Sequence, residues 1–106
     1  MRAGEPKVEL DLNDPDFQAR LFALDRELQR AALETLRKIR SLTWSEVYRD
    51  NGLKWEKISS ISPPKGVLAV YSLRITRSCR ATAYRQGNAM RLLLISPDHD
   101  ATYGRK

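Results

Sequence analysis

The sequence has few of the residues that hold metals or disulfides. Its 106 residues include a single cysteine, Cys79, and a single histidine, His99. One cysteine cannot form an intramolecular disulfide, and one histidine cannot build a histidine-based metal site alone. We therefore expect no metal and no cofactor, and we expect Cys79 to be a small buried residue rather than a nucleophile.

Long apolar runs are also missing. No stretch approaches the ~20 consecutive apolar residues that a membrane-spanning helix needs, and Met1–Pro6 lacks the apolar run of a signal peptide. There is no internal repeat or linker, and splitting the chain would leave pieces too small to bury a core. We expect one domain over residues 1–106 in a cytoplasmic protein that has no membrane partner.

Negative charge is scarce toward the end of the chain. Residues 1–66 carry 12 Lys or Arg against 11 Asp or Glu, whereas residues 67–106 carry 7 against 2. Such an excess either makes a surface soluble or binds a polyanion, for which RNA is the first candidate. The positions of the charges on the fold must distinguish the two.

The first half of the chain predicts a strand followed by helices. Val8–Leu12 alternates apolar and acidic residues, and Asn13-Asp14-Pro15 is a helix start signal. Apolar residues then recur at three- and four-residue steps as far as Ile39. A single helix of that length would span about 40 Å, too long for a domain of this size. We expect a hairpin of two helices, broken near Asp25–Arg30.

A short third helix and a loop follow. Thr43-Trp44-Ser45-Glu46 fits a capping box, with Asn51-Gly52 as the stop signal. Residues Leu53–Ile58 are predicted to be extended. Ser59–Gly66, with Pro63-Pro64, is predicted to be a loop.

Three β-like runs complete the chain, namely Val67–Ile75, Cys79–Gln86 and Ala89–Ser96. Gly87-Asn88 predicts a two-residue hairpin that pairs Gln86 with Ala89. One face then receives Ala81 with Leu94, Ala83 with Leu92, and Arg85 with Met90, and should pack on the helices. The other face receives Arg80 with Ile95, Thr82 with Leu93, and Tyr84 with Arg91. The predicted fold class is α+β: an N-terminal strand, a helical hairpin and a short third helix packed on a C-terminal antiparallel sheet.

The preceding hairpin predicts two arginines face to face. A three-residue loop of Thr76-Arg77-Ser78 pairs Ile75 with Cys79 and Leu73 with Ala81, which sets Arg74 opposite Arg80. Like charges in such a pair repel unless an anion lies between them, and arginine presents a fixed fork of donors to phosphate. Ser72, Thr82, Tyr84 and Arg91 share this face, and the Tyr84 ring could stack on a base. The alternative is a sheet edge made safe by charge.

The last residues predict a capped helical turn. Ser96-Pro97 is the start signal, and His99 and Tyr103 lie four residues apart. Asp98 and Asp100 flank the imidazole and favour its charged form, so that His99 could be a general acid. The alternative is an exposed turn histidine without a role.

The last 40 residues resemble the C-terminal half of the RelE/ParE toxin superfamily. The resemblance lies in Arg74 on one strand, Arg80 followed by Tyr84 on the next, Arg91–Ile95, and the late His99 and Tyr103. It is closest to RelE-like and YoeB-like ribosome-dependent ribonucleases, which implies metal-free cleavage of mRNA in the ribosome. Ser72 departs from the family, which often has a basic residue there.

The resemblance also implies roles for these residues. Arg80 and Arg74 would clamp the phosphate, His99 would be the acid, and Tyr103 would position the base or phosphate. Glu56 lies where YoeB-like members place a catalytic glutamate, and Lys54 or Lys57 could take the lysine role of RelE-like members. A cognate antitoxin, the ribosome and mRNA would be the partners. Two alternatives are a ParE-like DNA gyrase inhibitor and a non-catalytic RNA-binding module.

Overall fold

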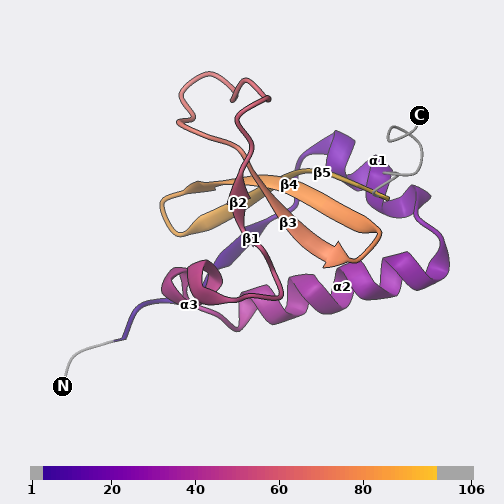
Figure 1. The fold of residues 1–106 in the computed structure, drawn as a ribbon, viewed down its shortest axis with the longest axis horizontal. Coiled ribbons are helices and arrows are strands. Elements are labelled where there is room, and N and C mark those ends of the chain that lie inside the picture. The colour runs from indigo at the N-terminus through magenta and orange to yellow at the C-terminus, as the bar shows by residue number, and fades with distance from the viewer. Residues whose placement is uncertain (1–3, 98–106) are drawn as a thin grey trace.

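The computed structural model describes residues 4–97, and within them three helices and five strands follow one another (Figure 1). Strand β1 (Glu9–Asp11) is followed by the helices α1 (Pro15–Ala23), α2 (Arg26–Arg40) and α3 (Trp44–Arg49). The other strands are β2 (Glu56–Lys57), β3 (Tyr71–Thr76), β4 (Cys79–Gln86) and β5 (Ala89–Pro97). No helix in this part of the chain is long and apolar enough to cross a membrane.

The helical hairpin is confirmed, and its break has a local cause. Asp14 caps α1 ahead of Pro15, and Asp25 caps α2 by accepting a hydrogen bond from the Leu28 N–H at 2.8 Å. The Gln29 side chain donates to the carbonyls of Leu21 and Phe22, both at 3.2 Å. These bonds supply a donor to the Phe22 carbonyl and a second one to the Leu21 carbonyl, which also accepts from the Leu24 N–H, at the end of α1. The break therefore needs neither glycine nor proline.

The predicted capping box of the third helix is also present. The Thr43 hydroxyl accepts from the Glu46 N–H at 3.2 Å, and the Glu46 carboxylate accepts from the Thr43 N–H at 2.9 Å. The hydrogen bond from that N–H is the main reason why the pKa of Glu46 lies below its usual value. The helix ends at Arg49, just before the predicted stop signal, and Asp50 is its C-cap.

The strands form one mixed sheet in the order β1-β5-β4-β3-β2. Strand β1 runs parallel to β5, and the other neighbours are antiparallel. The helices cover one face of this sheet, which we call the inner face (Figure 1). Its core unites Phe17 of α1, Ile39 of α2 and Trp44 of α3 with Leu73, Ala81 and Leu92 of the sheet. We call the opposite side the outer face.

The β4–β5 hairpin confirms part of the predicted register. Pairing runs as expected from Gln86 with Ala89 to Ala83 with Leu92, and then shifts by one residue. Thr82 faces Leu94, Ala81 faces Ile95 and Arg80 faces Ser96, so the predicted partners of these three residues were wrong. Strict alternation cannot bury both Leu92 and Ile95, whereas one extra residue at Leu93 turns Ile95 inward. Ile95 is 1% exposed and Leu94 is 38% exposed.

The β3–β4 hairpin keeps the predicted arginine pair. Leu73 faces Ala81 and Arg74 faces Arg80, but Cys79 pairs with Thr76 and not with Ile75 as predicted. The loop is therefore a turn at Arg77–Ser78, preceded by an irregularity at Ile75. The Ser78 N–H donates to the Thr76 hydroxyl at 3.0 Å, which holds this turn closed.

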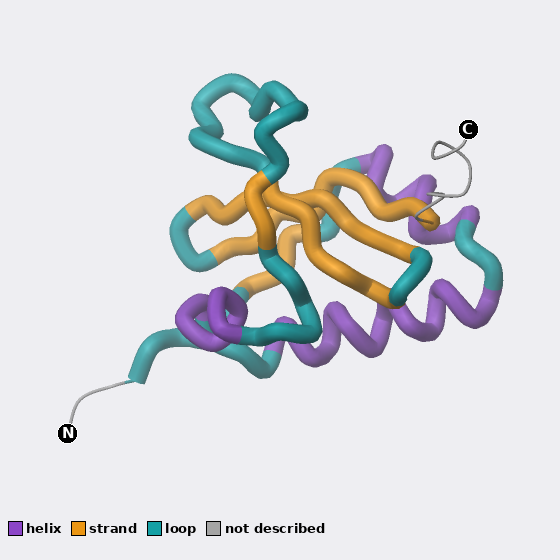
Figure 2. The backbone as a smooth tube through the Cα atoms, viewed as in Figure 1, coloured by secondary structure: helices purple, strands orange, loops and turns teal. Residues whose placement is uncertain are grey.

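Two strands are shorter than predicted. Extended pairing in Leu53–Ile58 is confined to Glu56–Lys57, and β3 begins at Tyr71 rather than Val67. The Val67 N–H bonds to the Pro64 carbonyl and the Ile58 N–H bonds to the Val70 carbonyl. The first bond closes a turn at the end of the loop, and the second continues the pairing of β2 with β3 past Tyr71. Figure 2 shows this loop, predicted as Ser59–Gly66, standing out from the sheet.

Candidate anion-binding site on the outer face

The outer face carries polar and charged residues from four strands. Side chains that are opposite each other in the ladder or two residues apart on one strand share a face. By the observed register, the outer face receives the following residues: Glu56, Ser72, Arg74, Arg80, Thr82, Tyr84 and Arg91. The parity of the sheet thus brings together five of the predicted site residues.

Arg74 and Arg80 form the centre of this face. They are direct cross-strand partners and both are half-buried. Arg80 Nη2 donates to Ser72 Oγ at 3.3 Å, whereas Arg74 Nε is buried and has no hydrogen-bond partner within residues 4–97. Neither guanidinium forms an ion pair with a carboxylate in that part of the chain. Two facing cations, one with an unsatisfied buried donor, are what an anion between them would stabilise.

Glu56 lies one strand away from the pair. It is the cross-strand partner of Ser72, whose hydroxyl contacts Arg80. An exposed carboxylate therefore shares the outer face with the two arginines without being their ion-pair partner.

The two lysines take other positions. Lys57 pairs with Tyr71, which in turn pairs with Ala83 of the inner face. Lys57 therefore lies on the inner side of the sheet, away from the arginine pair. Lys54 is exposed and precedes β2, with a left-handed φ of 49° that is unusual for a residue with a side chain. The Arg74 N–H donates to the Leu53 carbonyl at 2.7 Å, so the backbone at Lys54 lies beside Arg74.

Tyr84 and Arg91 lie further along the face. They are opposite each other, as predicted, and Arg91 Nε lies 3.6 Å from Asp11 Oδ2 of β1. Asp11 therefore neutralises part of the Arg91 charge. Tyr84 is only 7% exposed, so little of its ring is accessible for stacking.

The other two predicted site residues, His99 and Tyr103, lie outside the described residues. Strand β5 ends at Pro97, and its Ser96 is the partner of Arg80. Within residues 4–97, no three His, Cys, Asp or Glu side chains gather as metal ligands would.

A second cluster, of aromatic rings around Arg85, was not predicted from the sequence. Arg85 lies over the Trp44 ring at 4.7 Å, and its Nη1 donates to Tyr48 Oη at 2.8 Å. Trp55 and Tyr71 stack beside them with ring centroids 4.7 Å apart. The sequence did contain one indication of this cluster. Strand alternation puts Arg85 on the face packed against the helices, opposite Met90, where a cation needs a partner.

Comparisons with known proteins add one likeness. Neither a model of a known protein family nor a curated protein matches the sequence. Among solved structures, the chain is similar to a copper-bound mutant toxin from Helicobacter pylori, with 17% sequence identity and a TM-score of 0.48. The alignment covers 91% of this chain and 99% of that one.

Proposed function

We propose that this protein is the toxin of a type II toxin–antitoxin system, a ribosome-dependent endoribonuclease that cleaves mRNA and blocks translation. The observation that carries the proposal is the Arg74–Arg80 pair, in which two half-buried cations face each other and form no ion pair with a carboxylate of residues 4–97. A phosphodiester would fill that gap, and its negative charge would remove the repulsion. The motif resemblance of these strands to RelE-like and YoeB-like ribonucleases supplies the reaction.

The reaction needs only groups of the protein and the RNA. The ribose 2′-oxygen bonds to the adjacent phosphorus and its proton goes to the Glu56 carboxylate. The bond from phosphorus to the 5′-oxygen breaks, leaving a 2′,3′-cyclic phosphate on one fragment. The leaving oxygen takes a proton from His99 and becomes a 5′-hydroxyl. Arg80 and Arg74 stabilise the charge that develops on the phosphoryl oxygens.

Two features of the chain support these roles. Glu56 shares the outer face with the arginines through its pairing with Ser72. His99 follows Ser96, the partner of Arg80, by three residues, and three residues span at most about 11 Å. In the sheet order, β2 with Glu56 neighbours the strand of Arg74, and β5, which His99 follows in sequence, neighbours the strand of Arg80.

The charge of the chain also fits the proposed partners. The formal net charge is +6, which favours contact with mRNA and ribosomal RNA. The same charge favours a cognate antitoxin whose acidic segment covers the outer face and keeps the toxin inactive.

The test is mRNA cleavage in a translating extract. We expect cleavage by the wild type, a loss of about 100- to 1000-fold in Arg80→Ala, and a comparable loss in Glu56→Gln and His99→Ala. Arg77→Ala, which removes an exposed arginine from the β3–β4 turn, should cleave like the wild type. Intact mRNA with the wild type would refute the nuclease.

The same experiment separates the alternatives. Salt-dependent RNA binding without cleavage or growth arrest would identify a non-catalytic RNA-binding module. Growth arrest that survives His99→Ala, together with failing DNA supercoiling, would identify a gyrase inhibitor.

A further inference from the structure

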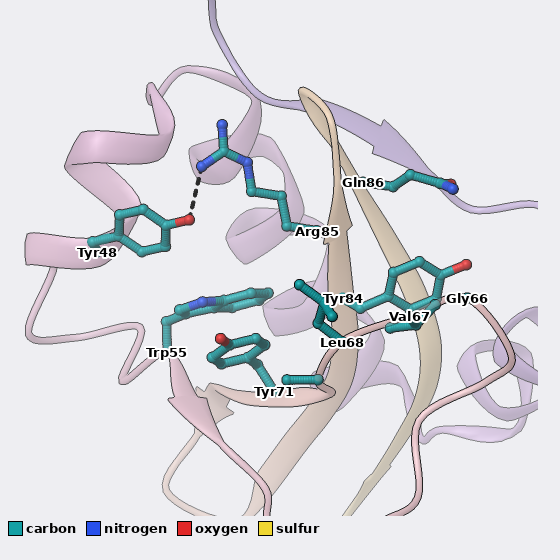
Figure 3. A pocket seen from close by; sticks show the side chains of 10 residues that line it. Tyr48, Trp55, Gly66, Val67, Leu68, Tyr71, Tyr84, Arg85 and Gln86 are labelled. Atoms are coloured by element: carbon teal, nitrogen blue, oxygen red, sulfur yellow. Dashed lines mark hydrogen bonds between the residues drawn. The ribbon is translucent and has the colours of Figure 1, made fainter.

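A cleft of about 320 Å³ lies at the other end of β4 from Arg80 (Figure 3). Among its walls are the last residues of β4, Tyr84–Gln86, and the segment of residues 66–69. The cleft exists because β3 starts at Tyr71, whose partner is Ala83. Within the described residues, Tyr84–Gln86 therefore pair with β5 alone, and one edge of β4 faces the cleft.

Aromatic rings form a fixed wall of this cleft. Trp55 and Tyr71 are stacked with an interplanar angle of 11°, and Trp44 packs edge-on against Trp55 at 5.3 Å. Tyr48 lies 5.6 Å from Trp44 and is 54% exposed, so its ring forms an open rim. These contacts hold the rings in place before any ligand arrives.

The polar groups of the cleft select the chemistry of the ligand. Arg85 and Gln86 line it, and no Asp or Glu of residues 4–97 does. Arg85 is already held by Trp44, Tyr48 and the Gly87 carbonyl, to which its Nε donates at 2.7 Å. The positive charge of Arg85 disfavours a cation. A flat ring with hydrogen-bonding edges fits the cleft, because aromatic faces stack on bases while the open backbone edge of β4 can meet base edges.

We propose that this cleft binds one unpaired nucleobase of a single-stranded RNA. The inference rests on the proposed function, since it adds a subsite for the strand whose phosphate lies at the arginine pair. Tyr84 follows Arg80 by four positions on β4, which is about 14 Å at 3.4 Å per residue. An RNA strand that follows the outer face of β4 and turns over its free edge at Tyr84–Gln86 would place one of its bases, not the scissile one, in the cleft.

A peptide strand is the main competing occupant of an open sheet edge. Here the free edge is only the three residues Tyr84–Gln86, whereas an average strand has about 5–6. Such a short edge offers few backbone hydrogen bonds to a peptide. A nucleobase needs only one or two, and it gains the aromatic contacts as well.

The test is binding of a 2′-O-methyl adenosine hexamer, which cannot be cleaved because the attacking hydroxyl is blocked. Trp55 in the wall and Trp44 behind it report binding through their fluorescence. We expect saturable quenching by the hexamer, weakened about 5- to 150-fold by Tyr48→Ala, because loss of one stacking ring costs about 1–3 kcal/mol. Tyr48→Phe, which keeps the ring, should bind within threefold of the wild type.

Two controls make the outcome specific. Phe22→Ala removes a ring that is 72% exposed on α1 and should leave binding unchanged. Adenosine should compete with the hexamer for the cleft, whereas ribose 5-phosphate should not. Absence of quenching, equal affinity of Tyr48→Ala and wild type, or competition by ribose 5-phosphate alone would overturn the proposal. Competition by an acidic peptide but not by adenosine would also overturn it and indicate a protein ligand.

The binding test and the cleavage test can fail separately. If the wild type leaves mRNA intact in the extract but the hexamer binds as described, the cleft stands and the nuclease fails. If mRNA is cleaved and Tyr48→Ala binds like the wild type, the nuclease stands and the cleft fails.

Discussion

Replacing Arg74 by methionine should stabilise the free protein. The arginine holds a buried Nε without a partner in the described part of the chain and faces a second cation, Arg80. An unsatisfied buried donor costs about 1–3 kcal/mol, and like charges across a ladder add about 0.2–1 kcal/mol. Methionine has a similar length and keeps the packing of the arginine stem. After allowance for the lost contacts of the guanidinium, we expect a net gain of about 1 kcal/mol.

Thermal unfolding in phosphate-free buffer measures this gain. For a domain of this size, about 1 kcal/mol raises Tm by roughly 4 °C. Phosphate should then reverse the order, because an anion at ten times its Kd stabilises the wild type by about 1.4 kcal/mol and has no site in Arg74→Met. Arg77→Met is the matched control, since Arg77 is exposed in the turn, and it should leave both values unchanged.

A Tm of Arg74→Met below that of the wild type in phosphate-free buffer would refute the reasoning. It would mean that the guanidinium stabilises the free fold, as an arginine that only protects a sheet surface would. An equal response of both proteins to phosphate would show that the anion binds elsewhere.

Two further predictions concern the fold. Ile95→Ala should reduce the free energy of unfolding by about 2–5 kcal/mol in chemical denaturation, and Leu94→Ala by less than about 1 kcal/mol. The reason is that the bulge buries Ile95 and exposes Leu94. The reverse order would show that β5 pairs without a bulge. Asp50 is partly desolvated, which raises its pKa, but hydrogen bonds from Lys38 and the Leu53 N–H outweigh this and lower the pKa below the usual value. A lowered folded-state pKa stabilises the fold above the unfolded-state pKa of about 3.9, and this contribution is lost as pH falls through the folded-state value. The advantage of the wild type over Asp50→Asn in urea melts should therefore be constant above about pH 5 and shrink below it, whereas a pH-independent difference would contradict the ion pair.

Much of the fold could be predicted because its signals are local. Asp14-Pro15 and the Thr43–Glu46 box act within one helical turn, and the structure confirms both helix starts. The pairing of Arg74 with Arg80 was predictable because parity and the burial of Leu73 leave few registers open. A bulge, by contrast, responds to the three-dimensional fit of Ile95 into the core, which no alternation pattern contains.

The start of β3 is a second departure from the predicted strands. Residues 67–70 include strand-forming residues, yet the Val67 N–H closes a turn with the Pro64 carbonyl, and β3 pairs with β4 only from Tyr71 onward. This turn outweighs the β-propensity of the segment. It also opens the edge of β4, so the cleft could not have been predicted from a sequence that extends the strand through these residues.

Both candidate sites lie where the sheet departs from the usual pairing preferences of β-strands. Facing arginines destabilise a ladder, and a strand whose last three residues have no strand partner on one side within residues 4–97 presents an open edge. Sequences that fold well satisfy such local preferences, and departures concentrate where a ligand supplies the missing partner. Both departures fall on β4, with Arg80 near its start and Tyr84–Gln86 at its end. A phosphate at one end and a base at the other are the partners that a single RNA strand provides together, whereas a small anion would satisfy only the first.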